Sequence, residues 1–182
     1  MSLPVSIHWC SLVPNHEQAV RSALRELSEK LNERRADLPQ IELSELSSSD
    51  QKHLPAFLKK EGSWAPDHRA TPLDGKRVFV FCTYNYPPAR RTRDEVSKKL
   101  PEPKWGVTVY GRYAFVWEPE NKFIVWHEAM HLLWADDCYN ATGQTTCEES
   151  CCIMQYIPCE KNCCGDLHLC SSNVRCVTAN LG

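Results

Sequence analysis

The chain has 182 residues, enough for one domain with a sizeable core and too few to suggest two full domains. Hydrophobic residues make up 42% of it and the formal charge is −2, so we expect a globular protein with neither nucleic acid nor a membrane as partner. There is no run of about 18 apolar residues for a membrane helix and no basic, apolar leader, so we expect a cytoplasmic protein.

The first two predicted elements are a strand and a helix. Residues 5–13 have the pattern of a strand, which a proline ends. Asn15 is a plausible N-cap for a helix that runs to about Arg35. Apolar residues recur at helical spacing along this helix, so one of its faces should be buried. These residues are Val20, Leu24, Leu27 and Leu31.

The middle of the chain is predicted to alternate strands with polar loops. Residues 41–46 alternate apolar and polar side chains, which indicates a second strand. Residues 47–75 are polar and contain three prolines, which predicts a loop with one helical turn around 54–60. Residues 77–82 are apolar and aromatic enough to predict a buried strand. A Pro- and Arg-rich loop follows, and then a short helix at 93–100.

The later elements lead to a second long helix and then to a cysteine-rich end. Residues 107–117 are rich in Val, Tyr, Phe and Trp, which predicts one or two extended segments. Asn121 can open the next helix, from Lys122 to about Trp134. Beyond residue 136 the periodicity fades, so we expect an irregular lobe there.

This order of elements predicts the fold class. Strands that alternate with helices favour an α/β (α+β) fold with a twisted mixed sheet. We expect residues 1–182 to form a single domain. Its N-terminal part, 1–135, would contain the second long helix, and its C-terminal part, 136–182, would be the cysteine-rich lobe.

The second long helix contains the motif His127-Glu128-Ala129-Met130-His131. Residues at i and i+4 share one helix face, so both imidazoles can reach one ion. Glu128 can reach a metal-bound water without ligating the metal, which is the position of a general base. The rest of the helix is apolar nearly all round, and burying two histidines and a glutamate is costly unless a metal compensates. The competing interpretation is a chance match on an ordinary core helix.

A zinc ion needs a third protein ligand, with water as the fourth. Asp137, six residues after His131, can provide it if the helix ends and the chain turns back toward the metal. Asp136 is the near alternative. Glu148 and Glu149 are later alternatives, from a different segment.

The motif and its surroundings resemble a known clan of zinc proteases. His127-Glu-x-x-His131 followed by Asp137 is similar to the extended zinc motif of the metzincins, although Trp134 stands at the usual glycine. The downstream Cys-Ile-Met-Gln-Tyr segment looks like the Met-turn of that clan, in which a methionine, here Met154, lies beneath the metal. The resemblance covers about residues 5–156, and its specific part is about 126–156. By this likeness, Tyr113 to Trp117 would be the edge strand above the cleft, where a peptide substrate can add as a further strand.

Within the clan, the archaemetzincin family is the most similar. Its motif has a cysteine directly after the third ligand, as Cys138 is here, and another two residues before the Met-turn methionine, as Cys152 is here. In that family such cysteines help to hold a second, structural zinc. We therefore expect a structural metal site at Cys138, Cys152, Cys170 and Cys176. Alternatives for the last two ligands are Cys159, Cys163 and Cys164.

Cysteine usage leaves a second interpretation of the lobe open. The chain has 11 cysteines, of which nine fall between Cys138 and Cys176. Two pairs of adjacent cysteines are more typical of a disulfide framework, which would fit a secreted protein. Cys10 and Cys82 stand apart in apolar strand-like runs, and we expect both in the core.

The resemblance implies a zinc-dependent peptidase that acts on a peptide or protein substrate. A metal-activated water would attack the peptide carbonyl, with Glu128 as general base and Tyr156 as a hydrogen-bond donor to the developing oxyanion. The alternative is a catalytically weak or inactive zinc-binding protein with a regulatory or peptide-binding role. A third possibility is a hydrolase of another zinc class that uses Glu148 or Glu149 as ligand. The oligomeric state is left open.

Overall fold

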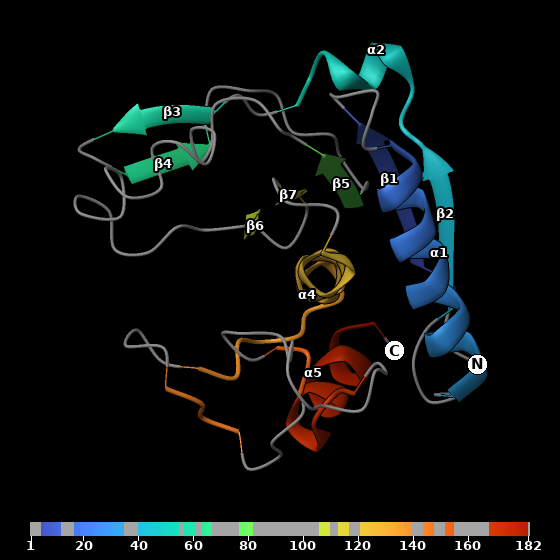
Figure 1. Cartoon of the computed structure of the whole chain (residues 1–182), viewed down its shortest axis with the longest axis vertical. Coiled ribbons are helices and arrows are strands. Elements are labelled where there is room, and N and C mark those ends of the chain that lie inside the picture. Colours follow the sequence, from blue (N-terminus) through green and yellow to red (C-terminus); the bar gives the residue numbers. More distant parts are fainter. Residues whose placement is uncertain are drawn as a thin grey trace.

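The computed structural model describes residues 5–11, 17–34, 40–54, 57–60, 63–66, 77–81, 106–109, 113–116, 121–139, 144–147, 152–154 and 168–181. In these ranges a small open sheet is combined with several helices, which is compatible with the predicted α/β class (Figure 1). The helices are α1 (Glu17–Arg34), α2 (Ser48–Gln51), α4 (Lys122–Leu132) and α5 (Ser171–Leu181). The strands are β1 (Val5–Ser11), β2 (Ile41–Glu45), β3 (Phe57–Lys60), β4 (Ser63–Pro66), β5 (Arg77–Phe81), β6 (Gly106–Val109) and β7 (Tyr113–Val116).

The main sheet has five strands in the order β2-β1-β5-β7-β6. All neighbouring pairs are parallel except β6 and β7, which are antiparallel, with Gly106 opposite Val116 and Val109 opposite Tyr113. The outer strand β6 therefore runs against the direction of the rest of the sheet. A separate antiparallel pair is formed by β3 and β4.

Helix α1 covers the core through the predicted apolar stripe. Val20, Leu24, Leu27 and Leu31 are all buried, together with Ala23, which confirms this part of the prediction. The Trp126 indole of α4 donates a hydrogen bond of 2.8 Å to the Ala23 carbonyl. This bond satisfies the one polar atom of a large buried ring and fixes α4 against α1.

Helix α4 is buried on nearly every face. Its N-cap is Asn121, whose side chain accepts a hydrogen bond of 3.1 Å from the amide of Phe123. Every residue from Ile124 to Leu132 is buried except His131. In Figure 1 α4 lies between the strands β6 and β7 and the helix α5, and its packing partners are α1, β6 and β7. None of the described helices has the length and apolar character required to cross a bilayer.

Two predictions about the middle of the chain are wrong. Residues 57–60 form the strand β3 rather than a helical turn, because they pair with β4, and the helical turn lies earlier, at α2. Tyr113 to Val116 is not the edge strand, because β7 pairs with β5 on one side and with β6 on the other. All four residues of β7 are buried, as expected for a central strand, and the outer strand beside it is β6, Gly106–Val109.

The C-terminal lobe contains a helix that the sequence did not predict. α5 spans Ser171 to Leu181, and its inner face is short, with Asn173 and Val177 buried. Such a narrow face gives little helical periodicity in the sequence. Cys10 is buried as expected, whereas Asn15, Cys82 and the short helix at 93–100 lie outside the described residues.

Candidate metal centre

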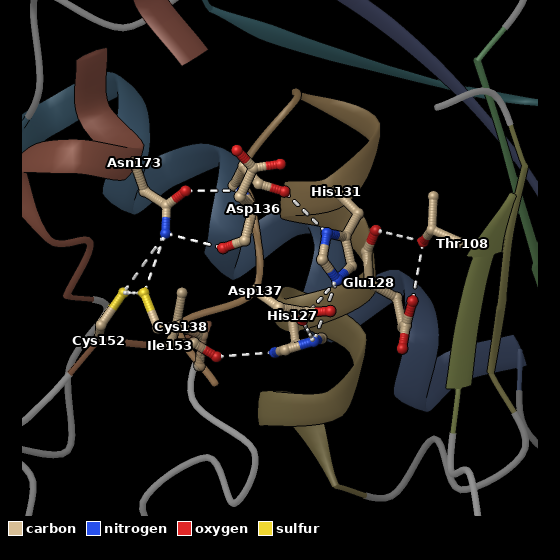
Figure 2. A network of polar contacts seen from close by, with 11 residues as sticks. Thr108, His127, Glu128, His131, Asp136, Asp137, Cys138, Cys152, Ile153 and Asn173 are labelled. Atoms are coloured by element: carbon tan, nitrogen blue, oxygen red, sulfur yellow. Dashed lines mark hydrogen bonds and ion pairs between the residues drawn. The ribbon is translucent and has the colours of Figure 1, made fainter. Parts of the chain in front are cut away.

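Three side chains converge at the C-terminal end of α4. The Nε2 atoms of His127 and His131 are 3.2 Å apart, and the Asp137 Oδ1 lies 3.3 Å from the first and 3.2 Å from the second (Figure 2). A tetrahedral zinc ion with bonds of about 2.0–2.1 Å keeps its nitrogen and oxygen ligands about 3.3–3.4 Å apart. The spacing of these three atoms therefore fits a single metal ion.

The hydrogen bonds made by the Nδ1 atoms of both imidazoles determine that the Nε2 atoms are the ones free to bind a metal. His127 Nδ1 lies 2.9 Å from the Ile153 carbonyl, and His131 Nδ1 lies 2.8 Å from the Ala135 carbonyl. A carbonyl only accepts, so both Nδ1 atoms carry the hydrogen, and in the neutral imidazoles each Nε2 presents a lone pair. Two such lone pairs and the carboxylate of Asp137 then face one another. A proton can bridge only two of these three atoms at a time, whereas a divalent cation can bind all three.

The charge state of the group suits a cation as well. Burial raises the pKa of Asp137, but hydrogen bonds to His127 and His131 outweigh it and hold that pKa well below its usual range. Burial lowers the pKa of His131, but the hydrogen bond to Asp137 and the charge of Glu128 outweigh it and raise that pKa overall. A metal ion would therefore meet an ionised Asp137 carboxylate, and it would displace the proton of His131, because histidine binds a metal in its neutral form.

The path from α4 to Asp137 depends on a sharp turn at Trp134. The Ala135 amide donates to the Met130 carbonyl at 3.1 Å and the Trp134 amide to the His131 carbonyl at 3.1 Å, which are the two bonds of a Schellman motif. Trp134 has φ 68°, the left-handed conformation that glycine adopts most easily. Trp134 thus occupies the position at which a Schellman motif usually has glycine.

Glu128 is held by the edge strand β6. It is only 6% exposed, and the Thr108 hydroxyl lies 2.8 Å from its Oε2 and 3.0 Å from its backbone carbonyl. A Cβ at Gly106 would come within 2.5 Å of the Glu128 Cγ, so glycine makes room for this side chain. Burial raises the pKa of Glu128 despite the nearby imidazoles and this hydrogen bond. Sequence analysis missed both β6 residues, although positions two apart on a strand share a face.

The turn that contains Met154 supports the first ligand. Met154 is fully buried, and its carbonyl accepts a hydrogen bond of 2.8 Å from the Cys138 amide. The preceding residue, Ile153, provides the carbonyl for His127. The ring of Tyr139, which sequence analysis did not single out, is stacked near His127 with centroids 6.3 Å apart.

The other candidate ligands are placed differently or not described. Asp136 lies next to Asp137 but turns away, with its carboxylate 3.8 Å from the Cys176 sulfur. Tyr156, Glu148 and Glu149 lie outside the described residues. Asp137 is thus the acidic residue that the described part of the chain brings to both histidines.

Cysteines form a second candidate metal group, separate from the first. Its four sulfur atoms are within 4.8 Å of one another. The Cys138 Sγ is 3.5 Å from that of Cys152 and 3.6 Å from that of Cys170, far beyond a disulfide bond of about 2.05 Å. Zinc–sulfur bonds of about 2.3 Å in a tetrahedron place sulfurs about 3.7–3.8 Å apart, so these distances fit a metal site. The members are Cys138, Cys147, Cys152 and Cys170.

Among the described residues, the cysteine that joins Cys138, Cys152 and Cys170 is Cys147, whereas the prediction had Cys176 in that place. Cys176 lies on α5 beside Asp136 and outside this group. Cys147 is brought in because the segment folds back on itself. Thr146 donates to the Cys138 carbonyl at 2.7 Å, and Tyr139 is bridged to Thr145.

Burial and hydrogen bonds shift the pKa of three of these thiols. Burial raises the pKa of Cys138 and of Cys152. In Cys170 the same effect is outweighed by hydrogen bonds, from the Asn173 backbone first, and the pKa is lowered overall. A metal ion binds thiolates, so loading this group would release protons.

The described residues thus contain two groups that could each bind a metal ion, one of histidine and aspartate and one of cysteine. Comparison with protein-family models, with curated proteins and with solved structures finds no match to this chain.

Proposed function

We propose that this chain is a zinc-dependent peptidase of the metzincin type, most similar to the archaemetzincins. The observation that carries the proposal is the convergence of His127, His131 and Asp137 on one point, with their donor atoms 3.2–3.3 Å apart. The buried carboxylate of Glu128 follows the first ligand on the same helix.

The donor set favours zinc and leaves room for a water. Two imidazole nitrogens and one carboxylate oxygen are typical of catalytic zinc sites, which keep the fourth position for water or substrate. The Asp137 side chain is 42% exposed, so solvent reaches this side of the group. By contrast, the four cysteines match the closed set of a structural zinc, and we propose that role for them.

Glu128 is proposed to move the proton. When bound, zinc supplies a Lewis acid that brings the pKa of a water ligand near neutral. Glu128 would accept a proton from the attacking water as its oxygen bonds to the peptide carbonyl carbon, and it would pass that proton to the nitrogen as the peptide C–N bond breaks. Its burial raises its pKa, which helps it to hold the proton between the two steps.

Thr108 is suited to keep Glu128 in place in both protonation states. Its hydroxyl has one hydrogen and two acceptors within reach, the Glu128 carboxylate and the Glu128 carbonyl. It can donate to the ionised carboxylate, and it can accept from the protonated one while donating to the carbonyl. Tyr156 remains the proposed donor to the oxyanion.

The proposed substrate is a peptide bound in extended form. Strand addition requires an outer strand, and β6 has that position in the described sheet. Because Gly106 and Thr108 of β6 contact Glu128, a peptide paired with β6 would pass close to the proposed base.

Glu128→Gln tests this proposal. The variant keeps the shape of the side chain and both histidines but cannot accept the proton. We expect fluorogenic peptide or casein cleavage to fall by roughly 10²–10⁴-fold, with zinc content unchanged by elemental analysis. Equal turnover in the variant and the wild type would contradict the assignment of Glu128, and no cleavage by the wild type across broad peptide libraries would contradict peptidase activity.

A second candidate is a zinc-binding protein that binds peptides without turnover. One observation favours it, because the Glu128 carboxylate already has a partner in Thr108, as a purely structural carboxylate would. In that case peptides would bind the wild type and Glu128→Gln with the same affinity and neither would cleave them.

A further inference from the structure

One buried amide contacts both the cysteine group and the residue that precedes Asp137. Asn173 of α5 is 3% exposed, and its Oδ1 accepts a hydrogen bond of 2.6 Å from the Asp136 amide. Its Nδ2 donates to the Asp136 carbonyl at 2.9 Å and faces three sulfur atoms, two of which, those of Cys138 and Cys152, are drawn in Figure 2. The three are the Sγ atoms of Cys138, Cys170 and Cys152, at 3.2, 3.6 and 3.9 Å.

The orientation of this amide follows from its partners. The Asp136 N–H can only donate, so the atom that faces it is the oxygen of Asn173. The Nδ2 then has two hydrogens, one for the Asp136 carbonyl and one for the sulfurs. Asn173 therefore satisfies both backbone groups of Asp136 and contacts the thiol group with the same side chain.

The segment that Asn173 holds joins the two groups directly. Asp136, Asp137 and Cys138 are consecutive. Asp137, whose carboxylate faces the two histidines, therefore lies between the residue that Asn173 holds and a cysteine of the second group. A second link runs through the turn of Met154. Ile153, whose carbonyl orients His127, follows Cys152 in the chain.

We propose that Asn173 is a positioning residue that couples the two sites, so that a metal ion bound by the four cysteines increases the affinity of the His127, His131 and Asp137 site for its own ion. This inference rests on the proposed metal-binding function. An ion at the cysteines fixes the sulfurs that Asn173 contacts, and Asn173 in turn fixes the backbone from which the Asp137 carboxylate extends. Partners outside the ligand shell often change metal affinity by about 10–100-fold.

The coupling can be measured by loading the sites in order. One equivalent of Zn²⁺ is expected to fill the thiol site first, because thiolates bind it strongly. Co²⁺ is then titrated against a competing chelator, and its absorption reports ligands of nitrogen and oxygen rather than sulfur. A His131→Ala variant, which should lose the second ion, identifies the site.

Asn173→Ala should weaken Co²⁺ binding at the second site by about 10–100-fold while the first ion stays bound. The matched control is Asn180→Ala on the same helix, because Asn180 is exposed and its amide donates only within α5, to the Cys176 carbonyl at 2.8 Å. We expect this control to bind within about twofold of the wild type, as expected of a surface substitution with no metal contact. Equal Co²⁺ affinity in Asn173→Ala and the wild type would overturn the proposal.

A second variant keeps the test decisive if Asn173→Ala does not fold. Cys147→Ser weakens the thiol site from a residue outside the segments 136–138 and 152–154, and coupling predicts weaker Co²⁺ binding at the distant site. Unchanged affinity in Cys147→Ser would contradict the coupling. Where both variants fold, the double variant should lose less Co²⁺ affinity than the product of the two single fold-losses, since both substitutions remove the same coupling. A double variant whose fold-loss equals that product would show that Asn173 does not carry the coupling. A wild type that binds no second ion would instead reject the proposed metalloenzyme itself.

Discussion

The two candidate metal groups in the described residues are built in opposite ways. The His127, His131 and Asp137 group comes from one stretch of 11 residues, whose geometry is fixed by one helical turn and a Schellman motif. The cysteine group collects four sulfurs from positions spread between 138 and 170. A local group depends on helix geometry, whereas a dispersed group can form only when the lobe folds. We therefore expect the first to control catalysis and the second to control stability.

Loss of a cysteine ligand should have the largest effect on stability. Cys152→Ser should lower the free energy of unfolding by at least about 3 kcal/mol, since structural zinc binding is a large part of the folding energy of small lobes. Denaturant unfolding with zinc present measures it. The comparison partner is His131→Ala, which should abolish turnover with a much smaller loss of stability. Equal destabilisation by the two variants would remove the distinction between the groups.

Gly106→Ala should displace the proposed base without affecting the metal ligands. The added Cβ would meet the buried Glu128 side chain at 2.5 Å, and the carboxylate has little free space to move into. We expect kcat to fall by roughly 10–100-fold, a usual cost of misplacing a catalytic group by about 1 Å, while zinc content stays unchanged. Thr178→Ala on the exposed face of α5 serves as control. A kcat within twofold of the wild type would show that this contact does not matter.

Asp137→His should alter the pH dependence of turnover. A carboxylate ligand makes the ion a weaker Lewis acid than a neutral imidazole does, so the pKa of the bound water should be higher in the wild type. Replacement by histidine should lower that pKa and move the acid limb of the kcat profile down by roughly one pH unit. An unchanged profile in a variant that still binds zinc would contradict the role of Asp137 as ligand.

Thr108→Val should have a smaller effect on catalysis. It removes the hydroxyl at 2.8 Å from the Glu128 carboxylate but keeps the size of the side chain. A hydrogen bond of this kind contributes about 1 kcal/mol, so kcat should fall by roughly 3–10-fold. An increase in KM with unchanged kcat would indicate a role in peptide binding instead.

Trp134→Gly should have the smallest effect, and it should be stabilising. Trp134 has φ 68° and its side chain is 45% exposed, so glycine relieves strain and loses little buried surface. The left-handed conformation costs about 1–2 kcal/mol for most residues, part of which the flexibility of glycine offsets. Thermal unfolding should show a gain of up to about 1 kcal/mol. A clear loss of stability would mean that the exposed indole has a structural role.

Local patterns were predictable from the sequence where one period or one cap decided the outcome. The stripe from Val20 to Leu31 and the cap at Asn121 predicted α1 and the start of α4. The spacing of His127 and His131 placed both on one helix face. The approach of Asp137 was predicted from its distance along the chain, but the turn at Trp134 was not foreseen.

Features that depend on tertiary contacts were not predictable in the same way. Cys147 was not among the predicted ligands, because spacing alone does not indicate that residues 139 and 145 pair and bring this cysteine back to Cys138. The resemblance to the metzincins implied an edge strand at Tyr113 to Trp117, but the extended pattern of the sequence alone does not say how β6 and β7 pair. Asn173 gave no signal, because a single polar residue on a short helix is usually exposed.

The most direct test of two metal groups is the metal content per chain, measured by elemental analysis of purified wild type, His131→Ala and Cys152→Ser. We expect two zinc ions in the wild type, one in His131→Ala, and fewer than two in Cys152→Ser. A wild type without bound metal after purification in the presence of zinc would contradict this expectation.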